Sequence, residues 1–298
     1  MKALSGFYFV QTEDSVNVFM CRARGLFKKE NLTPLVGDLV TFERNQELKL
    51  EGTIMDVAPR ICELNRPPIA NVDLALVVFS LVQPDLNLHL LDKFLVHVEL
   101  CGVKPVICFT KADLLNVPAN RASFSQQEIA RICEIYRQIG YHVCLTSVHD
   151  GTGIEQLKSL LDHHITVIAG QSGTGKSSLL NKLIPELTLA TGEISRKLGR
   201  GKHTTRHVEL FPIGTHGLIA DTPGFSQLEL PDIQPSLLTN AYPEFIHLAA
   251  TCKFRGCLHI QEPDCGIVKA VHQGTIASSR YEHYVALMKE LNEKKRRY

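Results

Sequence analysis

Residues 170–181, GQSGTGKSSLLN, predict a glycine-rich loop that opens a helix. They match the pattern GxxxxGK[ST] through Gly170, Gly175, Lys176 and Ser177. The apolar run ITVIA precedes the loop and the helix-like SSLLNKLI follows it. More than half of the chain lies before this phosphate-binding loop, whereas a GTP-binding domain usually begins with it. The first half must therefore hold something other than the usual start of such a domain.

The chemistry of phosphate binding assigns roles to this loop. Its glycines let backbone N–H groups turn toward phosphate oxygens, and the helix N-terminus adds its positive end. We expect Lys176 to reach the β- and γ-phosphates as a catalytic residue, and the Ser177 hydroxyl to ligate magnesium. The predicted nucleotide contacts are Gly170, Gln171, Ser172, Gly173, Thr174, Gly175, Lys176, Ser177 and Ser178. The alternative is a chance glycine-rich turn before a helix.

Two later segments carry candidate magnesium-side residues. DTPG, at residues 221–224, follows the apolar run HGLIA about 45 residues after the loop, so Asp221 is a predicted magnesium ligand and Gly224 a γ-phosphate contact. The basic stretch GRGKHTTRH offers Thr204 and Thr205 as the switch threonine that closes on magnesium when a γ-phosphate is present. Thr205 is the predicted ligand, with Thr204 as its alternative. A solvated basic loop is the competing interpretation of this stretch.

A base-reading motif separates GTP from ATP. FTKAD places Thr110, Lys111 and Asp113 directly after the strand-like KPVICF. The motif [NT]KxD reads guanine, because its aspartate accepts from the N1–H and the exocyclic amine while the lysine stem packs over the ring. Adenine presents no such pair of donors. A four-letter match is common by chance, so the motif gains its weight from its neighbours.

A second base-contacting loop is predicted in LTSVHDGTG. It places Thr146, Ser147 and Val148 at the next strand end, with their backbone near the guanine O6. The base-reading motifs thus precede the phosphate loop, the switch threonine and DTPG, so the domain is circularly permuted. Such a permutation requires original chain ends that lie close together, which is usual for compact domains. It also makes DTPG run directly into the C-terminal tail.

The order of strand-like and helical runs along the chain predicts three domains. Residues 1–66 read as short β-type runs separated by turn signals, which favours a small barrel. Residues 67–226 alternate strand-like and helical runs, as βαβ units with a mostly parallel sheet do. Residues 227–298 form a helical tail that bears cysteines. The runs of the middle segment before the phosphate loop are LALVVFS, HLLDKFLVHVELCG, KPVICFT, QQEIARICEIYRQIG and YHVCLTS.

Composition excludes some classes of protein. The 298 residues are 44% hydrophobic and 21% charged, which is ordinary for a soluble globular protein. The net charge is +1, so a nucleic-acid partner must be held by a local patch, such as the basic stretch 196–206. The longest apolar run, roughly residues 74–82, is too short to span a membrane, and no signal peptide is evident. We expect a cytoplasmic monomer without membrane contact.

The tail contains a cluster of metal-binding residue types. Three of the nine cysteines fall within residues 252–265. CKFRGCLHIQEPDC offers Cys252, Cys257, His259 and Cys265, and three thiolates with one imidazole suit tetrahedral Zn²⁺. A complete set of four leaves no open position, so the predicted role of the zinc is structural. Ordinary buried cysteines are the alternative.

Taken together, these motifs resemble the circularly permuted small-ribosomal-subunit biogenesis GTPases called the RsgA or YjeQ family. The resemblance covers essentially the whole chain, from the barrel through FTKAD, TSVHDGTG, GQSGTGKSSLLN, GRGKHTT and DTPGF to the CxxxxCxHxxxxxC tail. It implies a multidomain protein: an N-terminal OB-fold β-barrel that binds RNA, a central circularly permuted α/β P-loop GTPase and a C-terminal helical zinc domain. It also implies GTP with Mg²⁺, one structural zinc, and binding to the small ribosomal subunit through its 16S rRNA. From charge alone the barrel would not suggest RNA, since residues 1–66 hold nine basic and nine acidic residues.

The resemblance also bears on the hydrolysis step. Many GTPases place a water-orienting glutamine after DxxG, but here Phe225 follows, and its side chain cannot polarise water. The protein should therefore be slow alone. His203, beside the switch threonines, resembles the family histidine proposed for this role, and the competing interpretation is a phosphate contact to rRNA.

The sequence thus predicts a GTP hydrolase of late small-subunit maturation, stimulated by the subunit. The alternative is a signalling or scaffold GTP-binding protein with a protein partner. An ATP-dependent kinase or transporter ATPase is disfavoured by FTKAD.

Overall fold

The computed structural model divides into two compact units. It describes residues 1–12, 17–45, 47–48, 50–65, 67–117, 122–185, 208–220 and 233–295. One unit comprises Met1–Leu76 and Gly153–Ser226, and the other comprises Val77–Thr152 and Gln227–Tyr298. Strand β8 (Leu74–Ser80) begins in the first unit and ends in the second. Among the described residues, no helix has both the length and the apolar character that crossing a membrane requires.

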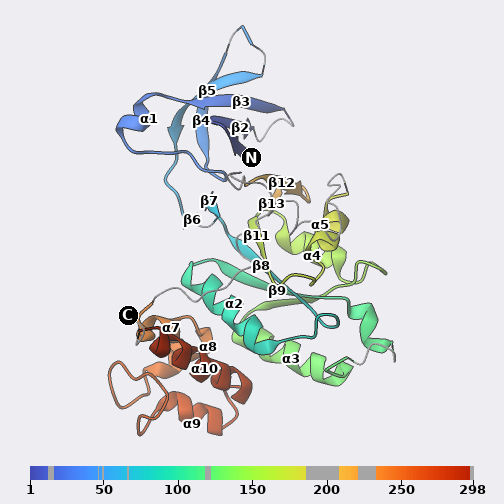
Figure 1. Cartoon of the computed structure of the whole chain (residues 1–298), viewed down its shortest axis with the longest axis vertical. Coiled ribbons are helices and arrows are strands. Elements are labelled where there is room, and N and C mark those ends of the chain that lie inside the picture. The colour runs from blue at the N-terminus through green and yellow to red at the C-terminus, as the bar shows by residue number, and fades with distance from the viewer. Residues whose placement is uncertain are drawn as a thin grey trace. The chain divides into compact units, whose positions relative to one another are not determined.

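The first unit opens with a five-stranded barrel (Figure 1). Its strands lie in the order β1-β2-β3-β5-β4, and helix α1 (Leu26–Lys29) lies between β3 and β4 in the chain. β3 and β5 pair in parallel, while the pairs β1/β2, β2/β3 and β4/β5 are antiparallel. The bounds are β1 Lys2–Leu4, β2 Phe7–Gln11, β3 Val18–Ala23, β4 Val40–Arg44 and β5 Glu51–Val57. This five-stranded arrangement, together with the match to known proteins reported below, confirms the predicted OB-fold barrel.

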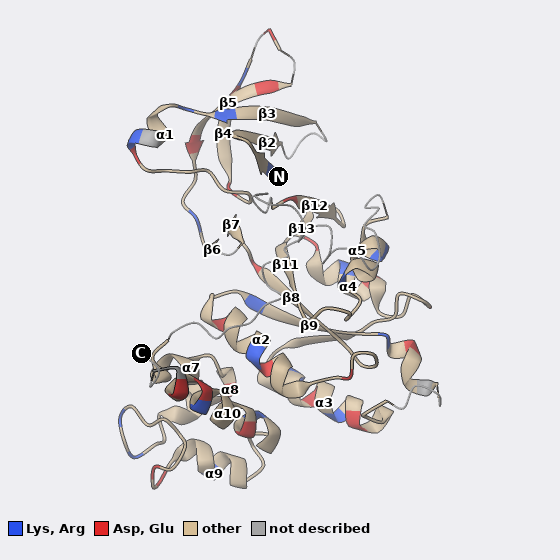
Figure 2. Ribbon diagram, in the orientation of Figure 1, with Lys and Arg blue, Asp and Glu red and all other residues tan. Residues whose placement is uncertain are grey.

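Alternation along the strands builds the core of the barrel. Phe19, Cys21 and Ile54 are buried with Phe27 of α1, because alternate side chains of a strand point to the same face of the sheet. Charged residues of both signs are scattered over the barrel (Figure 2). After the barrel, β6 (Glu63–Asn65) and β7 (Pro68–Ala70) form a small antiparallel hairpin.

The rest of the first unit carries the phosphate-binding half of the predicted GTPase. The start of β8 lies beside β11 (Ile165–Ala169), which pairs in parallel with β13 (Gly217–Ala220). β13 pairs with β12 (Leu210–Ile213) in antiparallel fashion. Helices α4 (Ile154–Leu161) and α5 (Lys176–Leu183) pack against each other.

A single carboxylate anchors the turn between β12 and β13. Asp162 Oδ1 accepts hydrogen bonds from the backbone N–H groups of Thr215, His216 and Gly217, at 3.0, 2.8 and 3.0 Å. These bonds hold the pKa of Asp162 at about 2, with the N–H of His216 as the largest cause. The hairpin that precedes DTPG in the chain is therefore fixed to the residue that follows α4.

The second unit begins with the base-reading half. Its strands lie in the order β10-β9-β8, and β9 (Lys104–Thr110) and β10 (His142–Leu145) are parallel. Helix α2 (Leu88–Leu100) packs on β9 and α3 (Gln126–Ile139) packs on β10. All seven residues of β8 are buried, as expected for a strand inside a sheet covered by helices.

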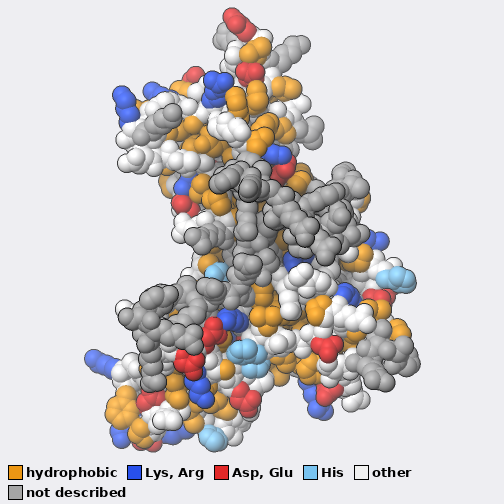
Figure 3. Space-filling view, in the orientation of Figure 1, with side chains coloured by type: hydrophobic (Ala, Val, Ile, Leu, Met, Phe, Trp, Pro, Cys, Tyr) orange, Lys and Arg blue, Asp and Glu red, His pale blue; other side chains and the backbone are white. Residues whose placement is uncertain are grey.

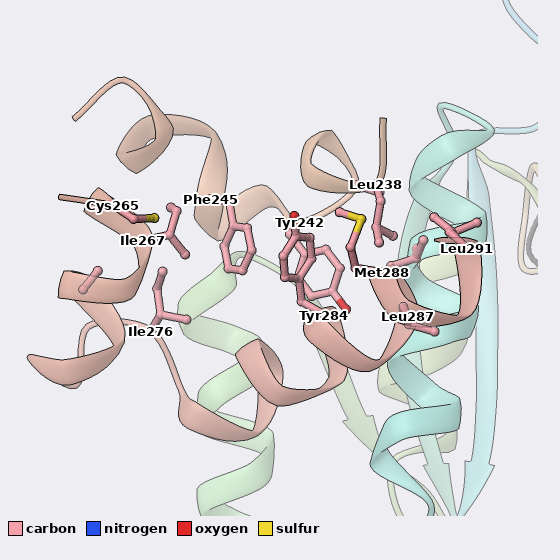
Figure 4. Packing of buried hydrophobic residues seen from close by; sticks show 13 residues of the cluster. Leu238, Tyr242, Phe245, Cys265, Ile267, Ile276, Tyr284, Leu287, Met288 and Leu291 are labelled. Atoms are coloured by element: carbon pink, nitrogen blue, oxygen red, sulfur yellow. The ribbon is translucent and has the colours of Figure 1, made fainter. Parts of the chain in front are cut away.

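The helical tail completes the second unit. It comprises α7 (Pro235–Asn240), α8 (Pro243–Ala249), α9 (Gly266–His272) and α10 (Ser278–Lys295). Figure 4 shows the rings of Tyr242, Phe245 and Tyr284 gathered at its centre, where the ring centroids of Phe245 lie 5.0 Å from those of both tyrosines. Val96 of α2 belongs to the same buried cluster, so the tail packs directly on the base-reading half.

A buried ion-pair network reinforces this packing. The Asp92 carboxylate of α2 is completely buried and accepts from Arg280 Nη1 of α10 at 2.6 Å and from Tyr136 Oη of α3 at 2.7 Å. Its other oxygen lies 2.5 Å from His283 Nδ1. Arg280 also donates to Glu244 of α8 at 2.8 and 3.2 Å. Burial alone would lower the pKa of Arg280, but the two carboxylates hold it well above its usual value.

Candidate functional site

The predicted phosphate loop lies between β11 and α5. Gly170, Gly173 and Gly175 have φ values of 137°, 82° and 89°, which side chains with a Cβ rarely adopt, so the backbone path needs glycine here. Thr174 is buried and its hydroxyl donates to the carbonyl of Gln171 at 2.9 Å. The loop therefore has the glycine-dependent turn and the helix start that phosphate binding requires.

Lys176 lies folded over its own loop. Its Nζ donates to the carbonyls of Gly170 and Gln171 at 2.7 and 2.6 Å. The predicted contacts of the loop differ in exposure: Ser172 and Gly173 are exposed, whereas Gln171, Ser177 and Ser178 are half-buried. The ammonium group is thus held at the mouth of the loop by carbonyl oxygens, which are weaker partners than phosphate oxygens.

The two base-reading loops meet in the second unit. Thr146 N–H donates to the carbonyl of Phe109 at 2.7 Å, and Ala112 N–H donates to the carbonyl of Thr146 at 3.1 Å. Thr110, Thr146 and Ser147 are buried, with at most 2% of each exposed. The structure therefore joins FTKAD to LTSVHDGTG, as the predicted guanine site requires.

Asp113 and Lys111 lie at the rim of this pair of loops. Asp113 is half-buried in the first turn of a 3-10 helix, η1 (Ala112–Asn116), and Val148 is also half-buried. Lys111 adopts a left-handed backbone conformation with φ 61°, and its ammonium group donates to the carbonyl of Gln83. Burial lowers the pKa of Lys111. Sequence reasoning missed Gln83, because a backbone carbonyl leaves no signal in a residue pattern.

Several predicted residues lie outside the described part of the chain. These are His203, Thr204, Thr205, Asp221, Gly224 and the Phe225 that takes the place of a glutamine. Their roles remain predictions from the sequence.

The predicted metal ligands converge in the tail. The ligand atoms of Cys252, Cys257, His259 and Cys265 all lie within 4.8 Å of one another. Cys252 Sγ lies 3.5 Å from His259 Nδ1 and 3.9 Å from Cys265 Sγ, and His259 Nδ1 lies 3.3 Å from Cys265 Sγ. A tetrahedral zinc with ordinary Zn–S and Zn–N bonds separates its ligand atoms by about 3.5–3.8 Å. The cluster is therefore compatible with one zinc ion.

Burial shifts the ionisation of the cluster toward the neutral forms of its side chains. Burial raises the pKa of the Cys257 thiol to about 12 and also raises that of Cys265. Burial lowers the pKa of His259, which keeps its imidazole neutral and able to bind a metal. Thiolates at these positions need a compensating positive charge, which a zinc ion supplies.

The loop that carries the ligands is fixed by residues that the sequence analysis did not identify. The Glu262 carboxylate accepts from the N–H groups of Leu258 and Ile260 at 2.7 and 2.9 Å. Tyr281 and Tyr284 of α10 donate to the carbonyls of His259 and Leu258 at 2.9 and 2.7 Å. A pattern search for metal ligands cannot find these residues, because they bind the backbone and not the ion.

Known proteins match the whole chain. A family model described as the RsgA N-terminal domain matches residues 1–54, and one described as the RsgA GTPase matches residues 57–231. A relative from Bacillus cytotoxicus, named small ribosomal subunit biogenesis GTPase RsgA, is 51% identical over 298 residues, which are 100% of this chain and 98% of the relative. A relative of the same name from Geobacillus sp. (strain WCH70) is 52% identical over the same shares.

A solved structure has the same arrangement. The crystal structure of YloQ, described as a circularly permuted GTPase, has a TM-score of 0.82 at 43% identity and covers 100% of this chain and 95% of its own. The order of motifs, the joined base-reading loops, the cysteine–histidine cluster and these matches agree. The chain therefore belongs to the RsgA family of circularly permuted GTPases.

Proposed function

We propose that this chain hydrolyses GTP during late maturation of the small ribosomal subunit, with the subunit as its activator. The names of its relatives support the biological role. The observation that best supports GTP as the substrate is the hydrogen bond between Ala112 N–H and the Thr146 carbonyl, because it joins the two loops that read guanine.

The base-reading roles follow from hydrogen-bond chemistry. The Asp113 carboxylate accepts from guanine N1–H and the exocyclic amine, and the stem of Lys111 packs over the ring. Thr110 and Thr146 are buried. The Thr146 hydroxyl joins the two loops by donating to the carbonyl of Phe109 at 3.2 Å, and the Thr110 hydroxyl ties its loop to β8 by donating to the carbonyl of Phe79 at 3.4 Å. Ser147 and Val148 bring backbone groups to the guanine O6.

The phosphate loop acts on the charge of the triphosphate. Residues 170–178 donate their N–H groups to phosphate oxygens, and Lys176 exchanges the carbonyls of Gly170 and Gln171 for the β- and γ-phosphates. Ser177, Thr205 and Asp221 would hold Mg²⁺, with Thr204 as the alternative to Thr205, and Gly224 would contact the γ-phosphate. The ion would supply positive charge that offsets the negative charge of the triphosphate.

Hydrolysis needs a group that orients water, and Phe225 cannot do so. We assign this role to His203, which docking on the subunit positions together with Thr205. A phosphate contact between His203 and rRNA is the competing role. The His203→Ala variant separates the two roles. If His203 is catalytic, the variant keeps its affinity for the subunit and loses stimulated turnover. If His203 contacts rRNA, the variant loses affinity for the subunit.

A GTPase assay with and without purified small subunits tests the proposed function. We expect turnover to rise when small subunits are added and not when the same mass of large subunits is added. Lys176→Ala is the control for contaminating GTPases and should show no stimulation. An unstimulated wild-type chain would contradict the ribosomal role and favour a signalling or scaffold protein.

We assign a structural zinc to Cys252, Cys257, His259 and Cys265. A full set of four ligands leaves no position for a substrate. Metal analysis of the purified chain should give one zinc per chain. A chain that holds less than a tenth of an equivalent and keeps its folded tail would refute this assignment.

We propose three domains: an OB-fold RNA-binding domain at residues 1–66, a circularly permuted GTPase domain at 67–226 and a zinc-binding domain at 227–298. Each of the two compact units holds parts of more than one of these domains. The barrel and the zinc domain are proposed to hold the 16S rRNA of the small subunit. The compartment of that reaction is the cytoplasm, and the proposed oligomeric state is a monomer.

A further inference from the structure

The loop between two of the cysteines carries an aromatic ring in an unusual position. Phe254 is 46% exposed, whereas Tyr242, Phe245 and Tyr284 of the same helical tail are completely buried. A phenylalanine ring left about half in water forgoes part of the free energy that burial would give it. We call residues 253–256 the knuckle tip.

The knuckle tip is also basic. Lys253 and Arg255 flank the ring, and the Lys253 ammonium lies 5.7 Å from the ring centroid. Lys253 and Lys269 share one carboxylate, Asp264, at 3.5 and 3.3 Å. Arg255 is exposed, and no hydrogen bond or ion pair joins it to any described residue. Lys253 and Lys269 thus share one carboxylate, and Arg255 adds an exposed cation to the tip itself.

The knuckle tip is held firmly at both ends. Cys252 and Cys257, the proposed zinc ligands, flank it, and Gly256 takes a left-handed turn with φ 74°. Lys253 N–H donates to the carbonyl of Asp264 at 3.4 Å, which joins the two arms of the loop. The space-filling view shows basic, acidic and hydrophobic side chains intermixed on the visible face of the helical tail (Figure 3). A tip with little freedom loses little conformational entropy on binding.

We propose that the knuckle tip binds unpaired RNA, with Phe254 stacked on a base and Arg255 on the adjacent phosphate. An exposed aromatic ring between cations fits single-stranded nucleic acid, because every base has a stacking face and every linkage carries a negative charge. The proposal rests on the proposed function only for the source of the RNA, which is the 16S rRNA of the small subunit. It adds the loop, the chemistry of recognition and the requirement for an unpaired base.

The test uses the full zinc-bound chain with deproteinised 16S rRNA and with intact small subunits as probes. Phe254→Leu keeps an apolar side chain but removes the ring, and it should weaken binding to both probes roughly tenfold. Phe254→Tyr should bind like the wild type. Arg255→Ala should also weaken binding and lower the slope of log K against log salt by about 0.7, the value for one contact to a single strand. The zinc content and the basal GTPase rate should stay unchanged in all three variants.

A matched control and three outcomes make the test decisive. Ile246→Ala alters another exposed apolar residue, 54% exposed on α8, and should leave binding unchanged. Wild-type binding by Phe254→Leu, or an unchanged salt slope for Arg255→Ala, would overturn the proposal while the wild-type chain still binds the subunit. If the variants bind subunits more weakly but bind free rRNA like the wild type, the partner of the tip is a ribosomal protein, and the proposed binding of RNA is wrong. A wild-type chain that binds neither probe would instead refute the proposed function.

Discussion

Replacing Asp92 by asparagine removes the central charge of the buried network. The side chains of Asp92 and Arg280 are 0% and 2% exposed and lie 2.6 Å apart, so water cannot compensate for the lost carboxylate. Removing one partner of a buried ion pair costs about 3–5 kcal/mol. Glu244 remains paired with Arg280 at 2.8 Å, and the new amide still accepts one hydrogen bond. We therefore expect the free energy of unfolding to fall by about 3 kcal/mol, the lower end of this range.

Hydrogen exchange resolves this loss by region, which suits a chain whose two units need not unfold together. A loss of about 3 kcal/mol raises the exchange rate of the most protected amides of α2 and α10 roughly 150-fold. The barrel amides should not change. The double variant Asp92→Asn/Arg280→Met should exchange more slowly than Asp92→Asn alone, because it leaves no unpaired buried charge.

A control in the same interface separates burial from charge. Lys93 and Glu290 also join α2 to α10, but their side chains are 15% and 35% exposed. Glu290→Gln should therefore raise exchange less than about fivefold, since exposed pairs contribute under about 1 kcal/mol. The reasoning would be refuted if Asp92→Asn raised the exchange rates of the α2 and α10 amides less than about fivefold. It would also be refuted if the exchange rates of the barrel amides rose by the same factor.

Four further predictions concern the nucleotide, the metal and pH. Asp113→Asn should lower the affinity for GTP roughly 100-fold and favour xanthosine triphosphate, whose C2 carbonyl accepts from the new amide; unchanged GTP binding in competition assays would contradict the base-reading role. Lys176→Ala should lower subunit-stimulated turnover at least about 100-fold, measured at saturating GTP. Cys257→Ser should lose zinc and raise hydrogen exchange in α9, with metal analysis as the check. Because the pKa of Asp162 is lowered from 3.8 to about 2 in the fold, its stabilising effect is present above pH 4 and is lost as pH falls toward 2. Urea denaturation followed by circular dichroism should show this loss in the wild type and a smaller one in Asp162→Asn.

The sequence predicted the strands that consist of continuous apolar runs. LALVVFS and KPVICFT coincide with β8 and β9, because dense runs of β-branched and apolar residues favour strands over other conformations. The hairpin of β6 and β7 was missed, since two prolines at its centre look like a chain break. Its strands are only three residues long, too short to show alternation.

The same limit applies to the site. Each ligand or phosphate-binding set lies within about 14 residues of sequence, so its spacing alone revealed it. Asp162, Gln83 and Arg280 act on residues far away in the chain or through backbone groups, and neither contact produces a motif. The domain boundaries, the switch threonines and His203 stay predictions.

The separation of Asp92 from Arg280 has a consequence for biosynthesis. The two residues are 188 positions apart, and ribosomes add about 5–20 residues per second. The carboxylate of α2 is therefore translated roughly 10–40 s before the guanidinium that neutralises it. During that time Asp92 can pair with Tyr136 of α3 but not with Arg280. The nascent chain thus carries a buried carboxylate without its guanidinium partner until α10 has left the exit tunnel.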